Sequence, residues 1–275
     1  MSADMSQPPA HNTTPHNTTP LRVVSLLPSA TEIVALLLAE QDGTAPPAGG
    51  RRGVALVGRS HECDHPAALV EHLPVLTAAK TTFTTSAEVD SAVRAALAAG
   101  TGLYTVDRGL LEQLAPDVII TQSLCSVCSV DFCLVERIAA GLPSRPRLVD
   151  LNPQSLGDVL TDIVAVGDAL GLQRQAAVVV QRLQARVDEA TSAAEEALHG
   201  GGGGGGEAEP SLSQRPSVAF LEWLEPIFIG GHWTPEIIHL AGGSHPLNPP
   251  RCEAAGSILS LIVSEAPGIG RRHSR

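Results

Sequence analysis

Four short apolar segments of this sequence, each with the pattern of a β-strand, end directly in small, polar or metal-capable residues. They are residues 21–27, 54–57, 118–121 and 218–221. Helix-like segments alternate with them, which predicts an α/β fold with parallel strands and crossover helices. In open α/β sheets, ligands bind outside the carboxyl ends of the strands. The four strand ends therefore predict one shared site, although they lie far apart along the chain.

The composition argues against several classes of function. A formal net charge of −11 disfavours a nucleic-acid-binding protein, because such proteins need a basic surface. No segment reaches about 18 consecutive apolar residues, so we expect no membrane insertion. Residues 1–20 are polar and lack the apolar stretch of a secretory signal. We therefore expect a disordered leader and a cytoplasmic location.

Changes of pattern along the chain predict two Rossmann-like lobes with parallel sheets, joined by a long rigid backbone helix. The helical pattern of residues 154–199 is broken only near Gly171, and its second half carries a continuous apolar stripe. After residue 243 the pattern of strands and helices stops, so the second lobe is expected to be incomplete. The expected segments are a disordered leader (1–20), an N-terminal α/β lobe (21–153), the backbone helix (154–199), a Gly-rich insertion (200–217), the start of a C-terminal α/β lobe (218–243) and an atypical, poorly ordered tail (244–275).

Residues that favour helix starts mark the helices between the strands. N-caps are expected at Ser29 (with Glu32 as capping-box partner), Thr85 (with Glu88), Asp107 and Thr234 (before Pro235). Pro28, Ser29 and Thr31 lie at the first of these helix starts. Backbone amides there could line the site, and a plain N-cap is the alternative.

The end of the second strand is rich in groups that bind ligands or metals. Residues 61–65 are His, Glu, Cys, Asp and His, followed by a proline. A solvated loop has this density only rarely, so His61, Glu62, Cys63 and Asp64 are predicted to take part in binding. In an extended chain alternate residues point to the same side, which would place His61, Cys63 and His65 together.

Five cysteines in a chain without an export signal do not predict a disulfide framework. Cys125 and Cys128 lie between a strand and a helix, at the spacing of a metal pair, and the helix start would favour thiolates. Cys63, Cys133 and His61 are the candidates for further zinc ligands. Metal or redox chemistry, lining of a ligand site and buried structural thiols remain three open interpretations of this pair.

The two tryptophans are conspicuous because only 3% of the residues are aromatic. Trp223 and Trp233 both follow the fourth strand, together with Glu222 and His232. Flat, large ligands favour aromatic walls with a few polar groups, so these four residues are predicted to form a binding wall. Core packing is the alternative. The single tyrosine, Tyr104, is expected to pack in the core or at the rim of the site.

The sequences around these strand ends resemble one known family. The similar blocks, in the family's order, are 22–33 (RVVSLLPSATEI), 57–66 (VGRSHECDHP), 114–122 (LAPDVIITQ), 220–226 with 230–236, and 241–243. The family that they resemble comprises the iron-siderophore and vitamin B12 periplasmic binding proteins, which are the class III solute-binding proteins of ABC transporters. Residues 60–64 (Ser-His-Glu-Cys-Asp) and the Cys-x-x-Cys at 125–128 are most similar to the cobalamin-binding branch of this family.

The resemblance implies two α/β lobes on a rigid helix, a ligand held between them, binding without catalysis, and an ABC permease as a partner. In such a protein His61 or His232 could supply an imidazole to the cobalt of a corrin. Two features depart from the family. The chain shows no export signal, and the tail after residues 241–243 matches none of the family's elements, which would fit a truncated second lobe.

We therefore expect a non-catalytic protein that binds a corrinoid (cobalamin-like) or other metal-chelate ligand between two lobes. Two other hypotheses stay open: an intracellular zinc-binding or thiol-redox protein centred on Cys63, Cys125 and Cys128, and a non-functional truncated isoform. The sequence lacks the Gly-x-Ser-x-Gly elbow of serine hydrolases and the P-loop of nucleotide-binding proteins. The predicted ligand-binding residues are Pro28, Ser29, Thr31, His61, Glu62, Cys63, Asp64, Cys125, Cys128, Glu222, Trp223, His232 and Trp233.

Overall fold

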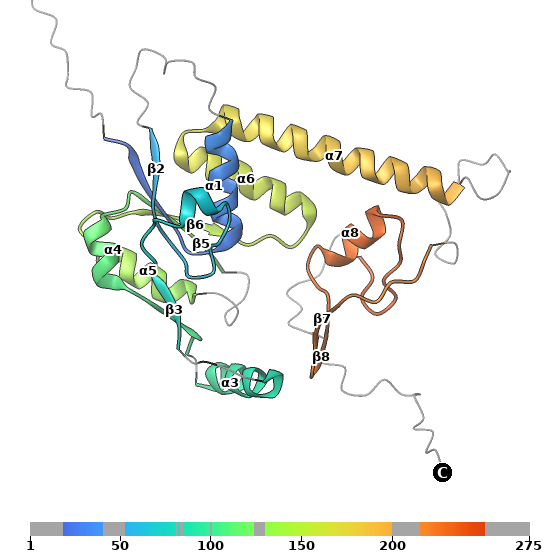
Figure 1. Ribbon diagram of the computed structural model, residues 1–275, viewed down its shortest axis with the longest axis horizontal. Coiled ribbons are helices and arrows are strands. Elements are labelled where there is room, and N and C mark those ends of the chain that lie inside the picture. Colours follow the sequence, from blue (N-terminus) through green and yellow to red (C-terminus); the bar gives the residue numbers. More distant parts are fainter. Residues whose placement is uncertain are drawn as a thin grey trace, which may run out of the picture.

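The computed structural model describes residues 19–40, 53–80, 82, 85–99, 101–123, 130–199 and 215–250 of the 275-residue chain. These residues form an α/β lobe and a smaller second lobe, with a long helix that contacts both (Figure 1). An α/β fold with a parallel sheet and a long helix is the fold class predicted from the sequence. Most of the expected leader, of the Gly-rich insertion and of the tail lies outside the described residues.

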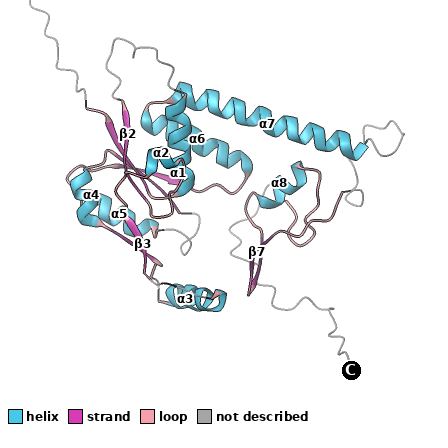
Figure 2. Ribbon diagram, viewed as in Figure 1, coloured by secondary structure: helices cyan, strands magenta, loops and turns pink. Residues whose placement is uncertain are grey.

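The N-terminal lobe is built on a four-stranded parallel sheet with the strand order β2-β1-β5-β6. Buried side chains fill the central strands β1 and β5, as is usual when helices cover both faces of a parallel sheet. Because all four strands are parallel, their carboxyl ends lie at one edge of the sheet. The strands are β1 (Leu21–Ser25), β2 (Val54–Arg59), β5 (Val118–Gln122) and β6 (Arg147–Leu151). Figure 2 colours the strands magenta and labels β2 among these four.

Neighbouring residues of each central strand enter different hydrophobic cores on the two faces of the sheet. Val23 of β1 and Ile120 of β5 belong to a core that includes helices α1, α6 (Leu156–Leu170) and α7 (Gln173–His199). Val24 and Ile119 belong to a second core, with helices α4 and α5. This alternation is the two-residue period of a strand. Three of these helices are α1 (Pro28–Ala39), α4 (Arg108–Leu114) and α5 (Phe132–Ala140).

A small antiparallel pair of strands, which was not predicted from the sequence, follows β2. It consists of β3 (Thr77–Ala79) and β4 (Tyr104–Val106). Arg59 of β2 bridges to Val75, just before β3. The short helix α2 (Ala67–Val70) lies between β2 and β3, and α3 (Ser86–Ala98) lies between β3 and β4.

Two predicted helix caps in this lobe are confirmed. The Thr85 amide donates to the Glu88 carboxylate at 3.2 Å, and the Glu88 amide donates to the Thr85 hydroxyl at 3.3 Å, which is a capping box. Asp107 Oδ1 accepts from the amide of Leu110 at 2.8 Å and caps α4. These caps satisfy amides that have no partner within the first turn of a helix.

Two other predicted caps are wrong by one or two positions. The N-cap of α1 is Leu27 rather than Ser29, because Pro28 already occupies the start of the helix and suits that position. The helix α8 (Thr234–Leu240) has Trp233 as its N-cap, and Thr234 is its first residue. Neither Leu27 nor Trp233 makes a side-chain cap bond.

Two helices occupy the segment that connects the lobes. α6 (Leu156–Leu170) ends at Gly171, whose φ of 71° lies in the left-handed region that glycine tolerates, and α7 (Gln173–His199) follows. A Cβ on Gly167 would lie 2.5 Å from the Cβ of Ala176, so glycine here lets the two helices approach closely. The break between them falls where the sequence analysis expects it.

The helix α7 contacts both lobes (Figure 1). Near its start, Ala176 and Val179 are buried in the core of the N-terminal lobe. Near its end, Ala194 and Leu198 lie against Gly242 of the second lobe. Its 27 residues span about 40 Å at 1.5 Å per residue. This helix matches the rigid backbone helix predicted between the lobes.

The described part of the second lobe differs from the expected parallel sheet. Its strands, β7 (Leu221–Leu224) and β8 (Ile227–Ile229), form an antiparallel hairpin with a two-residue connection. A single parallel bridge joins Ser217 to Ser244. The predicted strand at 218–221 is thus displaced by three residues. As a consequence Glu222 and Trp223 lie within β7 rather than after it.

Candidate ligand-binding site

The ends of β1 and β2 meet through buried side chains at the carboxyl edge of the sheet. The Thr31 hydroxyl lies 2.8 Å from the hydroxyl of Ser25, the last residue of β1. The same hydroxyl lies 3.0 Å from the Sγ of Cys63, which follows β2. All three side chains are buried. Two strand ends that are separated by more than 30 residues are therefore joined at one place, as the shared-site prediction requires.

The start of α1 contributes two further predicted residues. Pro28 is half-buried and Ser29 is exposed. The N-cap of α1 is Leu27, so Ser29 lies within the first turn of the helix and not at its cap. The first amides of a helix lack partners within the helix and can bind a polar group of a ligand. The interpretation of Ser29 as a plain N-cap is therefore wrong.

His61 is held at the same edge by Thr77 of β3. The His61 backbone amide donates to Thr77 Oγ1 at 3.0 Å, and His61 Nδ1 lies 2.6 Å from that oxygen. The Thr77 hydroxyl donates to Ser60 Oγ at 3.0 Å. A hydroxyl has one hydrogen, so we assign Nδ1–H as the donor to Thr77 and the lone pair of the neutral ring to Nε2. The ring of Tyr104 lies beside this imidazole, with ring centroids 5.5 Å apart.

The Nε2 atom of His61 is buried and has no hydrogen-bond partner within the described ranges. It lies 3.1 Å from Glu62 Oε1, but the alignment is not that of a hydrogen bond, and the contact is an ion pair only when the ring is protonated. A neutral imidazole nitrogen with a free lone pair is a common metal ligand. This acceptor is oriented but covered, because Nε2 is buried beside Glu62 Oε1, so a ligand reaches it only when the exposed Glu62 side chain moves aside.

Residues 60–64 form a turn, which changes the expected directions of their side chains. The amide of Cys63 donates to the carbonyl of Ser60 at 3.2 Å. Cys63 is buried, whereas Glu62, Asp64 and His65 are exposed. The expectation that His61, Cys63 and His65 share one side is therefore wrong, because it assumes an extended chain. Glu62 and Asp64 are accessible at the surface of the turn.

Arg59, the last residue of β2, holds this turn and is not among the residues predicted from the sequence. Its Nε donates to the carbonyl of Val70 at 2.9 Å. Its Nη1 lies 3.1 Å from the carbonyl of Ser60 and 2.9 Å from that of Cys63. The planar guanidinium can satisfy several carbonyls at once. No sequence signal identifies this role, since all three partners are backbone atoms.

Cys63 has the environment of a buried thiol. Burial raises the pKa of Cys63 above its ordinary value of 9.0, and hydrogen bonds, chiefly from Thr31, offset this only in part. In the described part of the chain, no group of three or more His, Cys, Asp or Glu side chains is placed to bind a metal ion. Cys125 and Cys128 lie outside the described residues, and Cys133 is exposed in α5. The zinc or redox hypothesis for these cysteines stays a prediction.

The second-lobe residues gather around the Gly230–Gly231 turn that follows β8. Glu222 Oε1 accepts from the amide of Gly231 at 3.3 Å. The rings of His232 and Trp233 lie beside each other, with centroids 5.8 Å apart. His232 has a φ of 50°, in the left-handed region that a histidine rarely adopts. Trp223 is half-buried, and its Nε1 donates to the carbonyl of Glu225 at 2.9 Å.

The first-lobe and second-lobe groups of site residues do not touch. No hydrogen bond or ring contact between them occurs in the described ranges of the two lobes. The lobes are instead joined at α6, where Glu236 Oε2 of α8 accepts from the amide of Leu156 at 2.8 Å. A ligand that bridges the two groups would have to span the space between the lobes.

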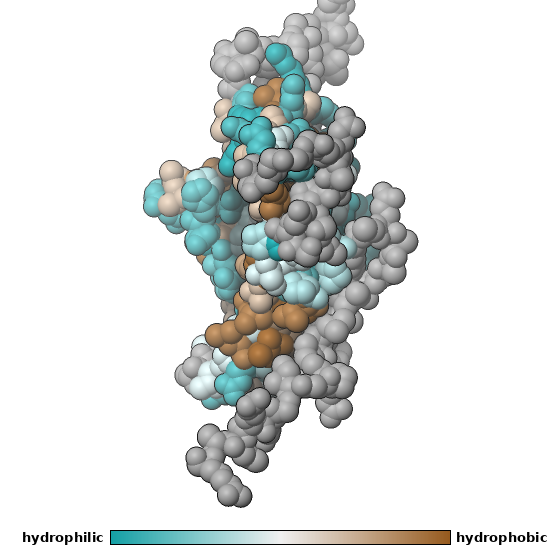
Figure 3. Space-filling view, turned by 90° about the vertical axis from the view of Figure 1, so that its right-hand side faces the viewer, coloured by the Kyte–Doolittle hydropathy of each residue, from teal (hydrophilic) through white to brown (hydrophobic). Residues whose placement is uncertain are grey.

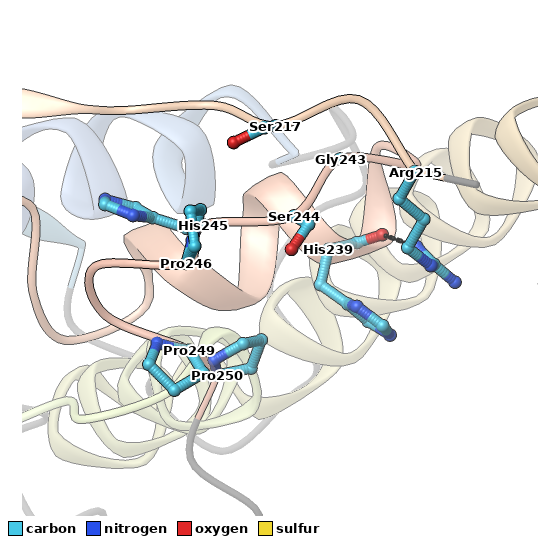
Figure 4. Close-up of a pocket in the computed structure, with 9 residues that line it drawn as sticks. All are labelled: Arg215, Ser217, His239, Gly243, Ser244, His245, Pro246, Pro249 and Pro250. Atoms are coloured by element: carbon cyan, nitrogen blue, oxygen red, sulfur yellow. Dashed lines mark hydrogen bonds between the residues drawn. The ribbon is translucent and has the colours of Figure 1, made fainter. Parts of the chain in front are cut away.

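Two hollows of the described surface lie elsewhere. One, of about 470 Å³, is lined by Arg215, His239, His245 and nearby serines and prolines (Figure 4). Arg215 Nη1 donates to the carbonyl of His239 at 2.8 Å, so it also caps the end of α8. The other, of about 300 Å³, lies between α3 and the β3–β4 pair. None of the predicted site residues lines either hollow.

Comparison with solved structures identifies the fold. No family model and no curated protein sequence matches the chain. The structure is similar to a possible iron-binding (periplasmic solute-binding) protein from Staphylococcus epidermidis, with a TM-score of 0.51, 16% identity and 82% of this chain covered. It is also similar to the periplasmic vitamin B12 binding protein of Vibrio cholerae, with a TM-score of 0.51, 17% identity and 82% of this chain covered.

The chain has the fold of the type III periplasmic binding protein lobes. It spans slightly less than two thirds of each of these two proteins, namely 66% and 65% of their lengths. Both are described as binding proteins. No helix in the described part of the chain is long and apolar enough to cross a membrane.

Proposed function

We propose that this chain is a non-catalytic solute-binding protein that holds a metal chelate, such as a corrinoid, against the carboxyl edge of its N-terminal sheet. The observation that carries the proposal is His61. Its Nε2 is oriented by the Thr77 contact and is left without a hydrogen-bond partner by the described residues. The atom is buried beside Glu62, so binding requires the exposed Glu62 side chain to move aside. An imidazole nitrogen of this kind can replace an exchangeable ligand on the metal of a chelate.

The surroundings of His61 suit a large ligand. Tyr104 lies beside the imidazole, and the exposed carboxylates of Glu62 and Asp64 lie on the same turn. In the second lobe, Trp223 and Trp233 are both half-buried, so part of each indole remains accessible. Aromatic surfaces with a few polar groups are typical of sites for flat ligands. Both groups of residues would contact a ligand that lies between the lobes.

The proposal names a partner, whereas the location expected from the sequence is a separate prediction that does not follow from it. Solute-binding proteins of this fold deliver their ligands to ABC permeases, and a permease is the partner we propose here. Cytoplasmic location, expected from the polar first 20 residues, stays a prediction. Sedimentation of the protein with membranes that carry a candidate permease would test the first, and fractionation of cells would test the second.

A titration with aquocobalamin tests the proposal directly. Replacement of the cobalt-bound water by an imidazole changes the visible spectrum, and calorimetry measures the affinity. We expect a spectral change with the unaltered chain and at least about a tenfold weaker affinity for His61→Ala. The matched control is His72→Ala, because exposed His72 contacts Glu71 at 3.1 Å just as His61 contacts Glu62.

Three results would contradict the proposal. A folded protein that gives neither heat nor a spectral change with high micromolar aquocobalamin does not bind this ligand. Equal losses of affinity for aquocobalamin in His61→Ala and His72→Ala would show that His61 does not bind the cobalt. Stoichiometric zinc in the purified protein, lost on Cys125→Ala and Cys128→Ala substitution, would support the zinc hypothesis instead.

A further inference from the structure

The hairpin β7–β8 exposes an aliphatic face in the second lobe. Leu221 pairs with Ile229, and Leu224 pairs with Ile227. Residues at these positions share one face of the hairpin, and Trp223, paired with Phe228, lies on the other. Leu224 is 73% exposed, Ile227 53% and Leu221 41%. A hydrophobic area is visible in Figure 3, which views the molecule from the side where β7 and β8 lie in Figure 1.

An uncovered aliphatic face of this kind is unfavourable for an isolated hairpin. Two-stranded hairpins are only marginally stable in water, and they gain stability when an apolar face packs against another segment. Contiguous exposed apolar patches usually mark a surface that binds something. The described residues of the second lobe leave this face in solvent, although they bury Gly230 and Pro235 nearby.

The chain itself supplies an apolar segment close to this face. Asn248 Nδ2 donates to the carbonyl of Gly230, the residue after β8, at 2.7 Å, so the chain leaves the described part beside the base of the hairpin. Residues 257–263 are Ser-Ile-Leu-Ser-Leu-Ile-Val and carry no charge. Six residues lie between Pro250 and this segment, so its first residue can lie up to about 23 Å from Pro250, more than the length of a four-residue strand.

We propose that residues 257–263 of the same chain pack across the aliphatic face of β7–β8. The segment has apolar side chains at five of its seven positions, which suits a flat aliphatic surface. It is also tethered next to that surface, so its effective concentration is high and no second molecule is needed. A second copy of the chain is the competing occupant, and it would bind with an affinity that depends on concentration.

Hydrogen exchange measured by mass spectrometry on the full chain tests this proposal. We expect amides of residues 257–263 to exchange at least about tenfold more slowly than in a free peptide of the same sequence. Leu224→Asp should return them to the peptide rate, because a carboxylate in the contact is costly to bury. Since Leu224 is 73% exposed, this change does not disturb the described cores.

The matched control is Val178→Asp, because Val178 is an exposed apolar residue (45%) of α7, away from the hairpin. It should leave the exchange of residues 257–263 unchanged. The proposal is overturned if these amides exchange at the peptide rate in the unaltered chain. It is also overturned, in favour of a second copy, if their protection disappears on dilution while sedimentation shows a dimer dissociating.

Discussion

Glu236 of the second lobe accepts a hydrogen bond from the backbone amide of Leu156, the first residue of α6, at 2.8 Å. The amides at the start of a helix have no partners within it, and the positive end of the helix dipole favours a carboxylate. Asp158 and Ser155 already form a capping box at this helix start. Glu236 thus completes the cap of a helix that belongs to the other side of the molecule.

We expect Glu236→Ala to lower the free energy of unfolding by about 1 kcal/mol, the usual cost of a lost cap. Urea unfolding followed by circular dichroism measures the change. Glu236→Gln is the matched variant, because it keeps an acceptor oxygen and removes only the charge, and it should lose less. Unfolding curves that coincide for all three chains would show that the contact between the lobes adds nothing to stability.

Asp162 of α6 should make the stability depend on pH. Burial, with the carboxylates of Asp158 and Asp150 nearby, raises the pKa of Asp162 from 3.8 to about 6. A carboxyl whose pKa is higher in the folded state stabilises the fold while it is protonated, and this contribution is lost as the pH rises from about 4 through 6. Asp162→Asn should therefore raise the melting temperature at pH 7 and leave it unchanged at pH 4.

The exposed Asp168 on the same helix provides the control for that experiment. Asp168→Asn should leave the melting temperature nearly unchanged at both pH values. An Asp162→Asn chain that melts at a lower temperature than the unaltered chain at pH 7 would contradict the assignment of Asp162 as a destabilising carboxylate.

Cys63 should resist alkylation. Burial raises the pKa of the Cys63 thiol, and the thiolate is the reactive form. At pH 8, iodoacetamide should modify exposed Cys133 much faster than Cys63, which peptide mass spectrometry resolves site by site. Because unfolding lowers this pKa, the stabilising contribution of the thiol is lost as the pH rises above about 9. Equal labelling of both cysteines in the folded chain would contradict the burial of Cys63.

Gly167 should tolerate no side chain. An added Cβ would lie 2.5 Å from the Cβ of Ala176 and 3.3 Å from the carbonyl oxygen of Leu172, so Gly167→Ala forces α6 and α7 apart. We expect a loss of about 1–3 kcal/mol in the free energy of unfolding, the usual cost of overpacking. Gly157→Ala in the first turn of α6, where the nearest atom is 3.7 Å away, should be close to neutral. Similar losses for both variants would exclude close packing as the cause.

Much of the fold was predictable because local pattern and tertiary structure agree. The apolar runs of β1 and β5 are strands, Asp107 and Thr85 start helices, and Gly171 ends one. The prediction of Ser29 as an N-cap is wrong, because Pro28, one residue earlier, is well suited to the first helical position. The parallel strands predicted for the second lobe are wrong, because the two-residue connection after Leu224 joins β7 and β8 as an antiparallel hairpin.

The site was predictable only to the level of which strand ends meet. That β1 and β2 are neighbours follows from the α/β pattern, but the contact of Thr31 with Cys63 depends on a turn that residue types do not specify. The role of Arg59 rests on backbone carbonyls, which leave no trace in the sequence. The orientation of His61 depends on Thr77 of β3, a strand of only three residues with little pattern of its own.

The continuous helix α7 also sets the rotational phase between the lobes. Each residue added within its exposed middle would turn everything beyond it by about 100° around the helix axis and move it about 1.5 Å along that axis. One inserted residue would swing Glu236 away from Leu156, whereas seven would nearly restore the angle while displacing the second lobe by about 10 Å. The length of α7 thus determines both the distance between the two lobes and their relative rotation. Insertions in α7 can change either one while nearly preserving the other.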